Sequence, residues 1–130
     1  MGAAVHHTRT VAAPLDAVFD LFTTAEGLCE WLAVRAEVDA RIGGSIRWTH
    51  ANGDVVAGTF VVLERPHRVV FTYGWEHGGY DVAVGSSEVE VTFTPLGEAT
   101  QLTLVHRGLP DALIDIHTRG WAHFLTGVVV

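Results

Sequence analysis

The chain of 130 residues contains no lysine and only one cysteine, and these shortages exclude several classes of protein. The lone Cys29 excludes an internal disulfide. The formal charge is −7, and the eight basic residues, all arginines, are scattered along the chain. Because binding to a phosphate backbone or an anionic membrane surface needs a basic patch, the sequence predicts neither nucleic acid nor membrane as a partner.

Long hydrophobic runs are also missing. No apolar stretch approaches the ~20 residues that a membrane-spanning helix needs. The first dozen residues lack the apolar core of a secretory signal. We therefore expect a cytoplasmic protein. The length predicts a single domain over residues 1–130, large enough to bury a core without disulfides.

Motifs for metal binding and covalent catalysis are absent as well. No HxxxH, HxH or CxxC pair occurs, although there are eight histidines. His117 and His123 are six residues apart, which is about 240° around a helix, so they do not face the same way. There is no GxSxG motif, and Cys29 falls in a short apolar segment typical of an inert thiol. We expect no metal, no other cofactor and no nucleophilic catalysis.

Hydrophobic periodicity predicts seven strands and three helices. Residues 33–41 alternate strictly, which predicts a strand with Val34, Ala36, Val38 and Ala40 on its apolar face. Asn52-Gly53 is a strong two-residue hairpin signal. A glycine-rich loop is expected at 76–86. The other strands are expected at 5–12, 45–50, 55–64, 68–75, 87–94 and 100–106, with short helices at 14–23 and 25–31 and a final helix opening at Pro110.

The final helix carries a stripe of large side chains. Ile114, His117, Trp121, Phe124 and Val128 recur at steps of three and four, which places them on one helical face. The sheet needs a cover for its apolar side, and this helix is the only element long enough. The pattern predicts an α+β fold in which a curved antiparallel sheet wraps around the C-terminal helix, with two short helices after the first strand.

Several segments resemble one protein family over nearly the whole chain. They are APLDAVFDLFTTAEGLCEWL, RIGGSIRW at 41–48, AGTF at 57–60, RVVFTYGW at 68–75, SSEVEVTF at 86–93 and GW at 120–121. In this order they resemble the activator of Hsp90 ATPase homologue-like proteins, a branch of the START/polyketide cyclase/Bet v 1-like superfamily. The resemblance implies a helix-grip fold and an Hsp90-type chaperone as one candidate partner.

An apolar chamber with a few polar tips is expected where the helix faces the sheet, and this composition is typical of a small-molecule pocket. A dry void of ~300 Å³ would cost about 7 kcal/mol, against a whole-domain stability of about 5–15 kcal/mol. The chamber is therefore either small or filled by water or a ligand. The predicted lining residues are Trp31, Trp48, His50, Phe60, Phe71, Tyr73, Trp75, Val91, His106, His117, Trp121 and Phe124.

Three functions remain open. The first is non-enzymatic binding of a small hydrophobic or aromatic molecule in the chamber. The second is a protein-interaction module that uses the polar sheet face or the loop 76–86. The third is a cyclase- or hydrolase-like enzyme, for which Asp81, Glu76, His106 and His117 are the acid–base candidates. For His117 the simpler interpretation is a core histidine tied to a backbone carbonyl or a neighbouring side chain. Val129 and Val130 at the end of the chain leave a homodimer open beside a monomer.

Overall fold

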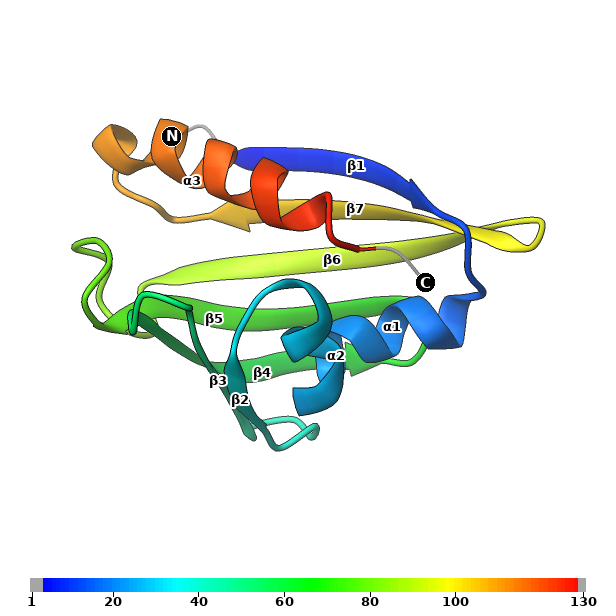
Figure 1. Ribbon diagram of the computed structural model, residues 1–130, viewed down its shortest axis with the longest axis horizontal. Helices are drawn as coiled ribbons and strands as arrows, with labels where there is room; N and C mark the ends of the chain where they lie inside the picture. The colour runs from blue at the N-terminus through cyan, green and yellow to red at the C-terminus, as the bar shows by residue number, and fades with distance from the viewer. Residues whose placement is uncertain (1–3, 129–130) are drawn as a thin grey trace.

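The computed structural model describes residues 4–128 and consists of one antiparallel sheet with three helices packed against it (Figure 1). The sheet order is β1-β7-β6-β5-β4-β3-β2, so that the first two strands of the chain form its two edges. The elements are β1 (Val5–Val11), α1 (Leu15–Thr23), α2 (Ala25–Trp31), β2 (Arg35–Val38), β3 (Ser45–Thr49), β4 (Val55–Glu64), β5 (Arg68–His77), β6 (Ser87–Leu96), β7 (Ala99–Arg107) and α3 (Asp111–Leu125).

The sheet has one apolar face because its strands alternate. In β6, Val89, Val91 and Phe93 are buried whereas Glu88 is exposed, as the sequence predicts. Strand β7 continues the same face, and every strand pairing in the sheet is antiparallel. Strands of this kind bury one side and leave the other in water. The buried side faces the helices.

A tight turn between β3 and β4 positions one wall of the site. Gly53 has a φ of 93°, in the left-handed region that favours glycine. The Asn52 side chain accepts a hydrogen bond from the backbone N–H of Asp54 at 3.0 Å. The hairpin that the Asn-Gly pair predicts is present, but its loop spans residues 51–53 and is closed by the backbone bond from the N–H of His50 to the carbonyl oxygen of Asp54 at 2.8 Å. A two-residue loop of type I′ would need a positive φ at Asn52, which it does not have. The turn holds His50 just after the end of β3, beside the helices.

The two short helices are joined by Thr24. Its hydroxyl accepts a hydrogen bond from the backbone N–H of Gly27 at 2.9 Å, which caps α2. A Cβ at Gly27 would lie 2.2 Å from the carbonyl oxygen of Asp20, so only glycine permits α2 to turn back so closely on α1. The aromatic rings of Phe19 and Phe22 pack against Phe93 of β6. The helix pair therefore covers one part of the apolar face.

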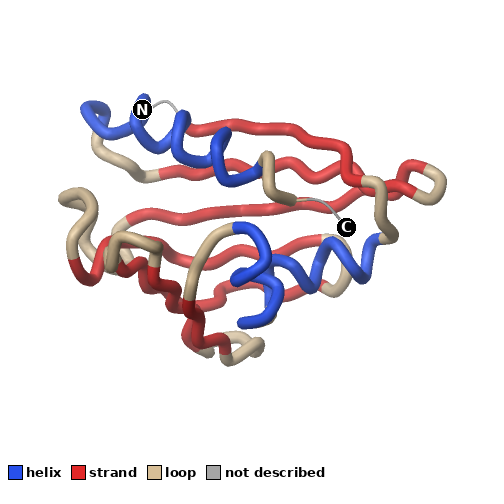
Figure 2. Tube along the Cα trace, viewed as in Figure 1, coloured by secondary structure: helices blue, strands red, loops and turns tan. Residues whose placement is uncertain are grey.

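Helix α3 covers the opposite part. It runs along the β1 edge of the sheet, while α1 packs on β6 and β7 and α2 lies beside β2, on the same face of the sheet (Figures 1 and 2). The ring of His7 on β1 donates from Nε2 to the carbonyl oxygen of Thr118 at 3.0 Å. Arg9 on β1 donates to the carbonyl oxygen of Thr126 at 3.3 Å. These bonds fix the helix to the sheet edge and leave the space between α3 and α2 without a covering element.

Two predicted elements are shorter than expected. The strand predicted over 33–41 is confined to Arg35–Val38, and two of the side chains expected on its apolar face, Val34 and Ala40, are exposed. Strand β2 is an edge strand, so nothing packs beyond it to bury a longer alternation. Helix α3 ends at Leu125, although Val128, the last residue of the predicted stripe, is still buried. Val129 and Val130 lie outside the described residues.

None of the helices in residues 4–128 is long and apolar enough to cross a membrane.

Candidate functional site

An open cleft of about 890 Å³ lies between α3, α2 and the β3–β5 part of the sheet. At the ~30 Å³ that a molecule occupies in liquid water, it has room for roughly 30 waters. Because the cleft is open to solvent, water fills it whenever no ligand is bound.

The chain's four tryptophans all line this cleft. An indole N–H can only donate, so each ring in the wall needs an acceptor. Trp31 donates to the carbonyl oxygen of Leu21 at 2.8 Å. The other three donate to histidine rings, each at 3.1 Å: Trp48 to His50, Trp75 to His117 and Trp121 to His106.

These bonds assign the histidine tautomers, because the nitrogen that accepts from an indole carries no proton. His117 accepts at Nε2 and donates from Nδ1 to the carbonyl oxygen of Leu113 at 2.8 Å. His106 accepts at Nδ1 and donates from Nε2 to the hydroxyl of Ser87 at 2.9 Å. Both rings have used both nitrogens. His117 is thus tied to a backbone carbonyl and also lines the cleft.

The environment keeps all three rings uncharged. Burial lowers the pKa of His106 to about 3, and the neighbouring His117 adds to the effect. Burial also lowers the pKa of His117 and of His50. Removal from water disfavours the imidazolium form. At neutral pH the histidines therefore act as hydrogen-bond acceptors for the indoles and supply no positive charge.

Ser87 and His106 have the spacing of a nucleophile and its base, but the direction of their hydrogen bond is opposite to the one that catalysis needs. The Ser87 hydroxyl donates to the carbonyl oxygen of Tyr73 at 2.8 Å, and the ring nitrogen facing it carries a proton. Both side chains are buried, and neither lines the cleft. A base must accept the proton of its nucleophile. The pair therefore joins β5, β6 and β7 and is not arranged for nucleophilic attack.

Tyr73 lies at the centre of the aromatic wall. Its ring packs edge-on against His106, with centroids 4.3 Å apart, and tilts against Trp48 and Trp121 at 5.9 and 6.1 Å. Within residues 4–128 its hydroxyl makes no hydrogen bond to the protein, and the residue lines the cleft. Burial raises the pKa of Tyr73, so the hydroxyl remains a neutral donor and acceptor.

His50 bridges the sheet and the helix. Its ring lies 5.4 Å from that of Trp75 and 5.1 Å from that of Phe124 on α3, tilted by 30° and 41°. Tyr80 in the loop after β5 packs on Trp75 and on His117, which extends the wall toward solvent. Three segments far apart in the chain thus meet in one aromatic rim.

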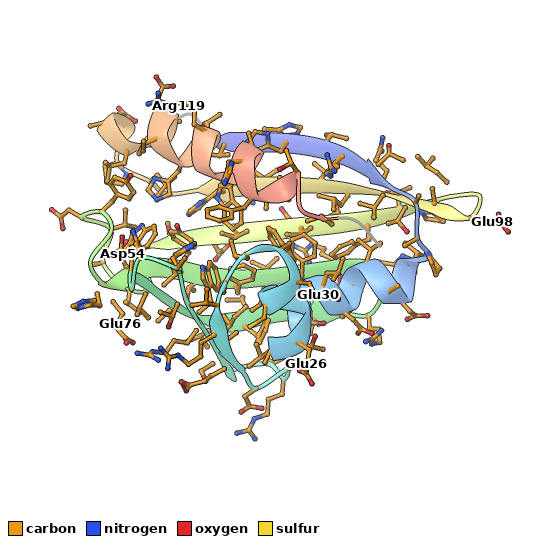
Figure 3. All side chains as sticks on the ribbon, in the orientation of Figure 1. Glu26, Glu30, Asp54, Glu76, Glu98 and Arg119 are labelled. Carbon is orange, nitrogen blue, oxygen red and sulfur yellow. The ribbon has the colours of Figure 1, made fainter. Side chains whose placement is uncertain are left out.

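The polar and charged side chains outside the aromatic wall lie at the mouth of the cleft. Glu30 on α2, Asp54 after the β3–β4 turn, and Arg119 and His123 on α3 belong to the lining (Figure 3 labels the first three). Glu30, Arg119 and His123 are exposed, and Asp54 is half-buried. The deeper wall is aromatic and neutral. The cleft can therefore receive an apolar body deep inside and a polar group near the entrance.

The predicted site residues separate into two groups. Eight of the twelve line the cleft: Trp31, Trp48, His50, Tyr73, Trp75, His117, Trp121 and Phe124. Phe60, Phe71, Val91 and His106 are buried behind that wall and do not line it. The acid candidates also lie elsewhere, because Glu76 pairs with Arg47 at 2.7 Å and Asp81 is exposed outside the lining.

Sequence reasoning did not identify several residues of the rim. Cys29 is exposed there, although it falls in a short apolar segment. Gly120 faces the cleft, and a Cβ added to it would have no neighbour within 4 Å. A glycine in the middle of a helix is unfavourable, so its presence was the available signal for a space kept open. In residues 4–128 no group of three or more His, Cys, Asp or Glu side chains could hold a metal ion.

Comparison with known proteins identifies relatives of this architecture. A family model described as activator of Hsp90 ATPase homolog 1-like protein matches residues 12–129. No curated protein matches the sequence significantly.

Three solved structures illustrate the likeness. A protein from Mesorhizobium loti is 20% identical, with a TM-score of 0.82 over 96% of this chain and 93% of the other. An Hsp90 activator from Plasmodium falciparum is 25% identical, with a TM-score of 0.76 over 98% and 94%. The Aha1 dimer from Colwellia psychrerythraea is 18% identical, with a TM-score of 0.78 over 97% and 92%. The fold is therefore shared over more than nine-tenths of each of these chains.

Proposed function

The chain belongs to the activator of Hsp90 ATPase homolog 1-like family, and we propose that it binds a small hydrophobic or aromatic molecule in the cleft without transforming it. The observation that carries this proposal is the gathering of all four tryptophans around one solvent-open cleft of about 890 Å³. Clefts of ~300–1,000 Å³ with mostly apolar walls and a few polar groups are typical of small-molecule sites. Release of water from such a wall drives binding of an apolar ligand.

The hydrogen bonds of the wall favour binding over catalysis. General base catalysis needs a nitrogen or carboxylate that is free to accept a proton from the substrate. His106 and His117 have no free nitrogen. The carboxylates of Glu30 and Asp54 lie at the mouth, where solvent competes with a substrate. Holding a ligand requires none of these groups to react.

The position of Gly120 provides a direct test. Gly120→Leu should place a side chain in the open space of the cleft, whereas Ala122→Leu adds the same side chain at an exposed position outside the lining. A panel of aromatic compounds and lipids is titrated against the wild type while tryptophan fluorescence is recorded, and bound masses are sought by native mass spectrometry. We expect quenching by some compounds in the wild type and Ala122→Leu, and at least tenfold weaker binding in Gly120→Leu. No response to any compound, or equal binding by both variants, would refute the proposal.

A second candidate function is a protein-interaction module of the Hsp90 co-chaperone type. The family match supports it, as does the Hsp90 activator from Plasmodium falciparum among the similar structures. The outer sheet face offers a polar surface, on which Arg47 pairs with Glu37 and Glu76. The test is the ATPase rate of a purified Hsp90 with the wild type, with Arg47→Glu and with Gly120→Leu. Stimulation that Arg47→Glu abolishes and Gly120→Leu retains would favour this function over ligand binding.

The oligomeric state accompanies this second candidate. The Colwellia psychrerythraea relative is a dimer, so a homodimer is an alternative to a monomer for this chain. Light scattering of the protein alone and with Hsp90 measures both states in one experiment.

A further inference from the structure

His50 differs from the other two histidines of the tryptophan pairs. His106 and His117 each use both ring nitrogens within the protein. His50 accepts the indole N–H of Trp48 at Nε2, 3.1 Å away. Its Nδ1 makes no hydrogen bond within residues 4–128, and the half-buried ring lines the cleft. One imidazole nitrogen therefore remains available to a ligand.

The partner indole decides what that nitrogen can do. Trp48 is 1% exposed, so its N–H has no water to turn to and must keep His50 as its acceptor. Because Nε2 must remain without a proton, the neutral ring carries its proton on Nδ1. The free position is thus a donor and not a base. A ligand atom that meets it must be an acceptor.

Packing restrains the orientation of the His50 ring. Trp75 and Phe124 contact it from β5 and α3, with centroid distances of 5.4 and 5.1 Å. The Asn52-Gly53 turn fixes its backbone from the other side. A donor held by packing loses little conformational entropy when a ligand binds, so it discriminates effectively in favour of ligands that carry an acceptor.

The surrounding charges restrict the ligand further. Burial lowers the pKa of each of the three histidines, which therefore supply no cation at neutral pH, and Arg119 is exposed at the mouth. A carboxylate buried among the indoles would lack a charged partner, which is unfavourable in an apolar wall. The buried part of the ligand should therefore be uncharged.

We propose that the cleft selects an uncharged aromatic molecule carrying an oxygen acceptor, such as an aryl ketone, and that Nδ1–H of His50 donates to this oxygen. This inference rests on the proposed function, since it specifies the ligand of the same cleft. Trp48 acts on selection through His50 as a positioning residue. The Tyr73 hydroxyl is the alternative hydrogen-bond donor to the same oxygen, and the experiment distinguishes Tyr73 from His50.

The test compares two probes with nearly the same skeleton, 1-tetralone and tetralin, which differ by one carbonyl oxygen. Dissociation constants are measured by NMR titration of the indole N–H signals for wild type, His50→Phe and Tyr73→Phe. His50→Phe keeps a ring against Trp75 and Phe124 but has no donor. The tetralone-to-tetralin affinity ratio should fall by about 3–10-fold in His50→Phe, the contribution expected of one hydrogen bond. It should change less than twofold in Tyr73→Phe.

Each other outcome overturns a different statement. Equal weakening of both probes by His50→Phe would overturn the assigned donor and leave binding in the cleft intact. A tetralone-to-tetralin affinity ratio that falls only in Tyr73→Phe would identify Tyr73 as the hydrogen-bond donor instead. Failure of both probes to bind the wild type would overturn the proposal for this class of ligand, and the panel tested against Gly120→Leu then decides the proposed function separately. If His50→Phe does not fold because the Trp48 N–H is left unpaired, the double variant Trp48→Phe/His50→Phe removes both partners and gives the same comparison.

A measurement without any ligand tests the premise. Long-range proton–nitrogen NMR spectra distinguish the two neutral tautomers of each ring. We expect the proton on Nδ1 in His50 and His117 and on Nε2 in His106. In Trp48→Phe the His50 ring should lose its preference for Nδ1–H. A wild-type His50 with its proton on Nε2 would overturn the inference whatever the probes do.

Discussion

Acid should destabilise this fold at a pH where the ion pairs of Glu76 and Glu90 are still intact, and His106 is the main cause. The ring is fully buried, accepts a hydrogen bond from Trp121 and donates one to Ser87. Burial lowers its pKa from the ordinary 6.5 of a histidine to about 3. A group whose pKa is depressed by folding adds stability above its unfolded pKa and loses it as the pH falls toward the folded value. The loss therefore begins near pH 6.5.

The magnitude follows from the two pKa values. The unfolded chain binds a proton on this residue below pH 6.5, and the folded chain does so only near pH 3. Between pH 8 and pH 5 this difference removes about 2 kcal/mol from the free energy of unfolding. His50 and His117 act in the same direction, since burial lowers their pKa values too. Hydrogen bonds from arginines lower the pKa of Glu76 and Glu90, so those ion pairs are lost only below this range.

Urea unfolding followed by tryptophan fluorescence at pH 8 and pH 5 measures this loss. His106→Gln is the matched control, because its amide can still accept from Trp121 and donate to Ser87 but does not titrate. The wild type should lose at least about 2 kcal/mol between the two pH values, and His106→Gln should lose about 2 kcal/mol less. Identical pH dependence in the two proteins would show that the buried imidazole is not the acid-sensitive group, and the reasoning from burial would be wrong.

Three further substitutions test the packing of the sheet and helices. Gly120→Ala should raise the free energy of unfolding by about 0.5–1 kcal/mol in a urea titration, since the new Cβ meets nothing within 4 Å in the middle of α3. Gly58→Ala should lower the free energy of unfolding by roughly 1–3 kcal/mol or more, because its Cβ would lie 1.7 Å from the carbonyl oxygen of Thr72 on the neighbouring strand. A change of the same sign in Gly120→Ala and Gly58→Ala would contradict this reasoning. Trp31→Phe should cost about 1–3 kcal/mol by leaving the carbonyl oxygen of Leu21 unpaired, and unchanged thermal unfolding would contradict that bond.

The fold could be predicted largely from periodicity because most strands of the sheet have one buried face and one more exposed face. Strands β6 and β7 alternate buried and more exposed residues over their central parts, which is the pattern that the sequence displays. The prediction was wrong in extent where burial depends on a neighbour. The alternation at 33–41 is as regular as that of β6, but β2 is at the edge of the sheet and Val34 is 61% exposed. Alternation records the pleat of a strand and not whether another element covers it.

The site was less accessible to sequence reasoning because its bonds join distant residues. Trp48 and His50 are two positions apart on one strand face, so their proximity could be anticipated. Trp121 and His106 are separated by 15 residues, and Trp75 and His117 lie in different elements, 42 residues apart. For each residue taken alone, the hydrophobic periodicity predicts that its side chain points toward the interior. Which imidazole meets which indole depends on the sheet register and on where α3 crosses it, and neither is encoded locally.

The same bonds explain why a histidine and a tryptophan occupy the apolar stripe of the last helix. A cleft that accepts aromatic molecules needs broad rings in its wall, and tryptophan provides the largest. Its N–H would be costly if left unpaired beside a bound apolar ligand. A neutral imidazole satisfies that N–H and is itself a flat ring that continues the wall, as His117 does for Trp75. Protonation would remove the acceptor nitrogen, so a histidine suits this role only where burial depresses its pKa. The bond of His117 to a backbone carbonyl and its place in the lining of the cleft are therefore two consequences of one arrangement, since the bonds that stabilise the wall also keep it uncharged.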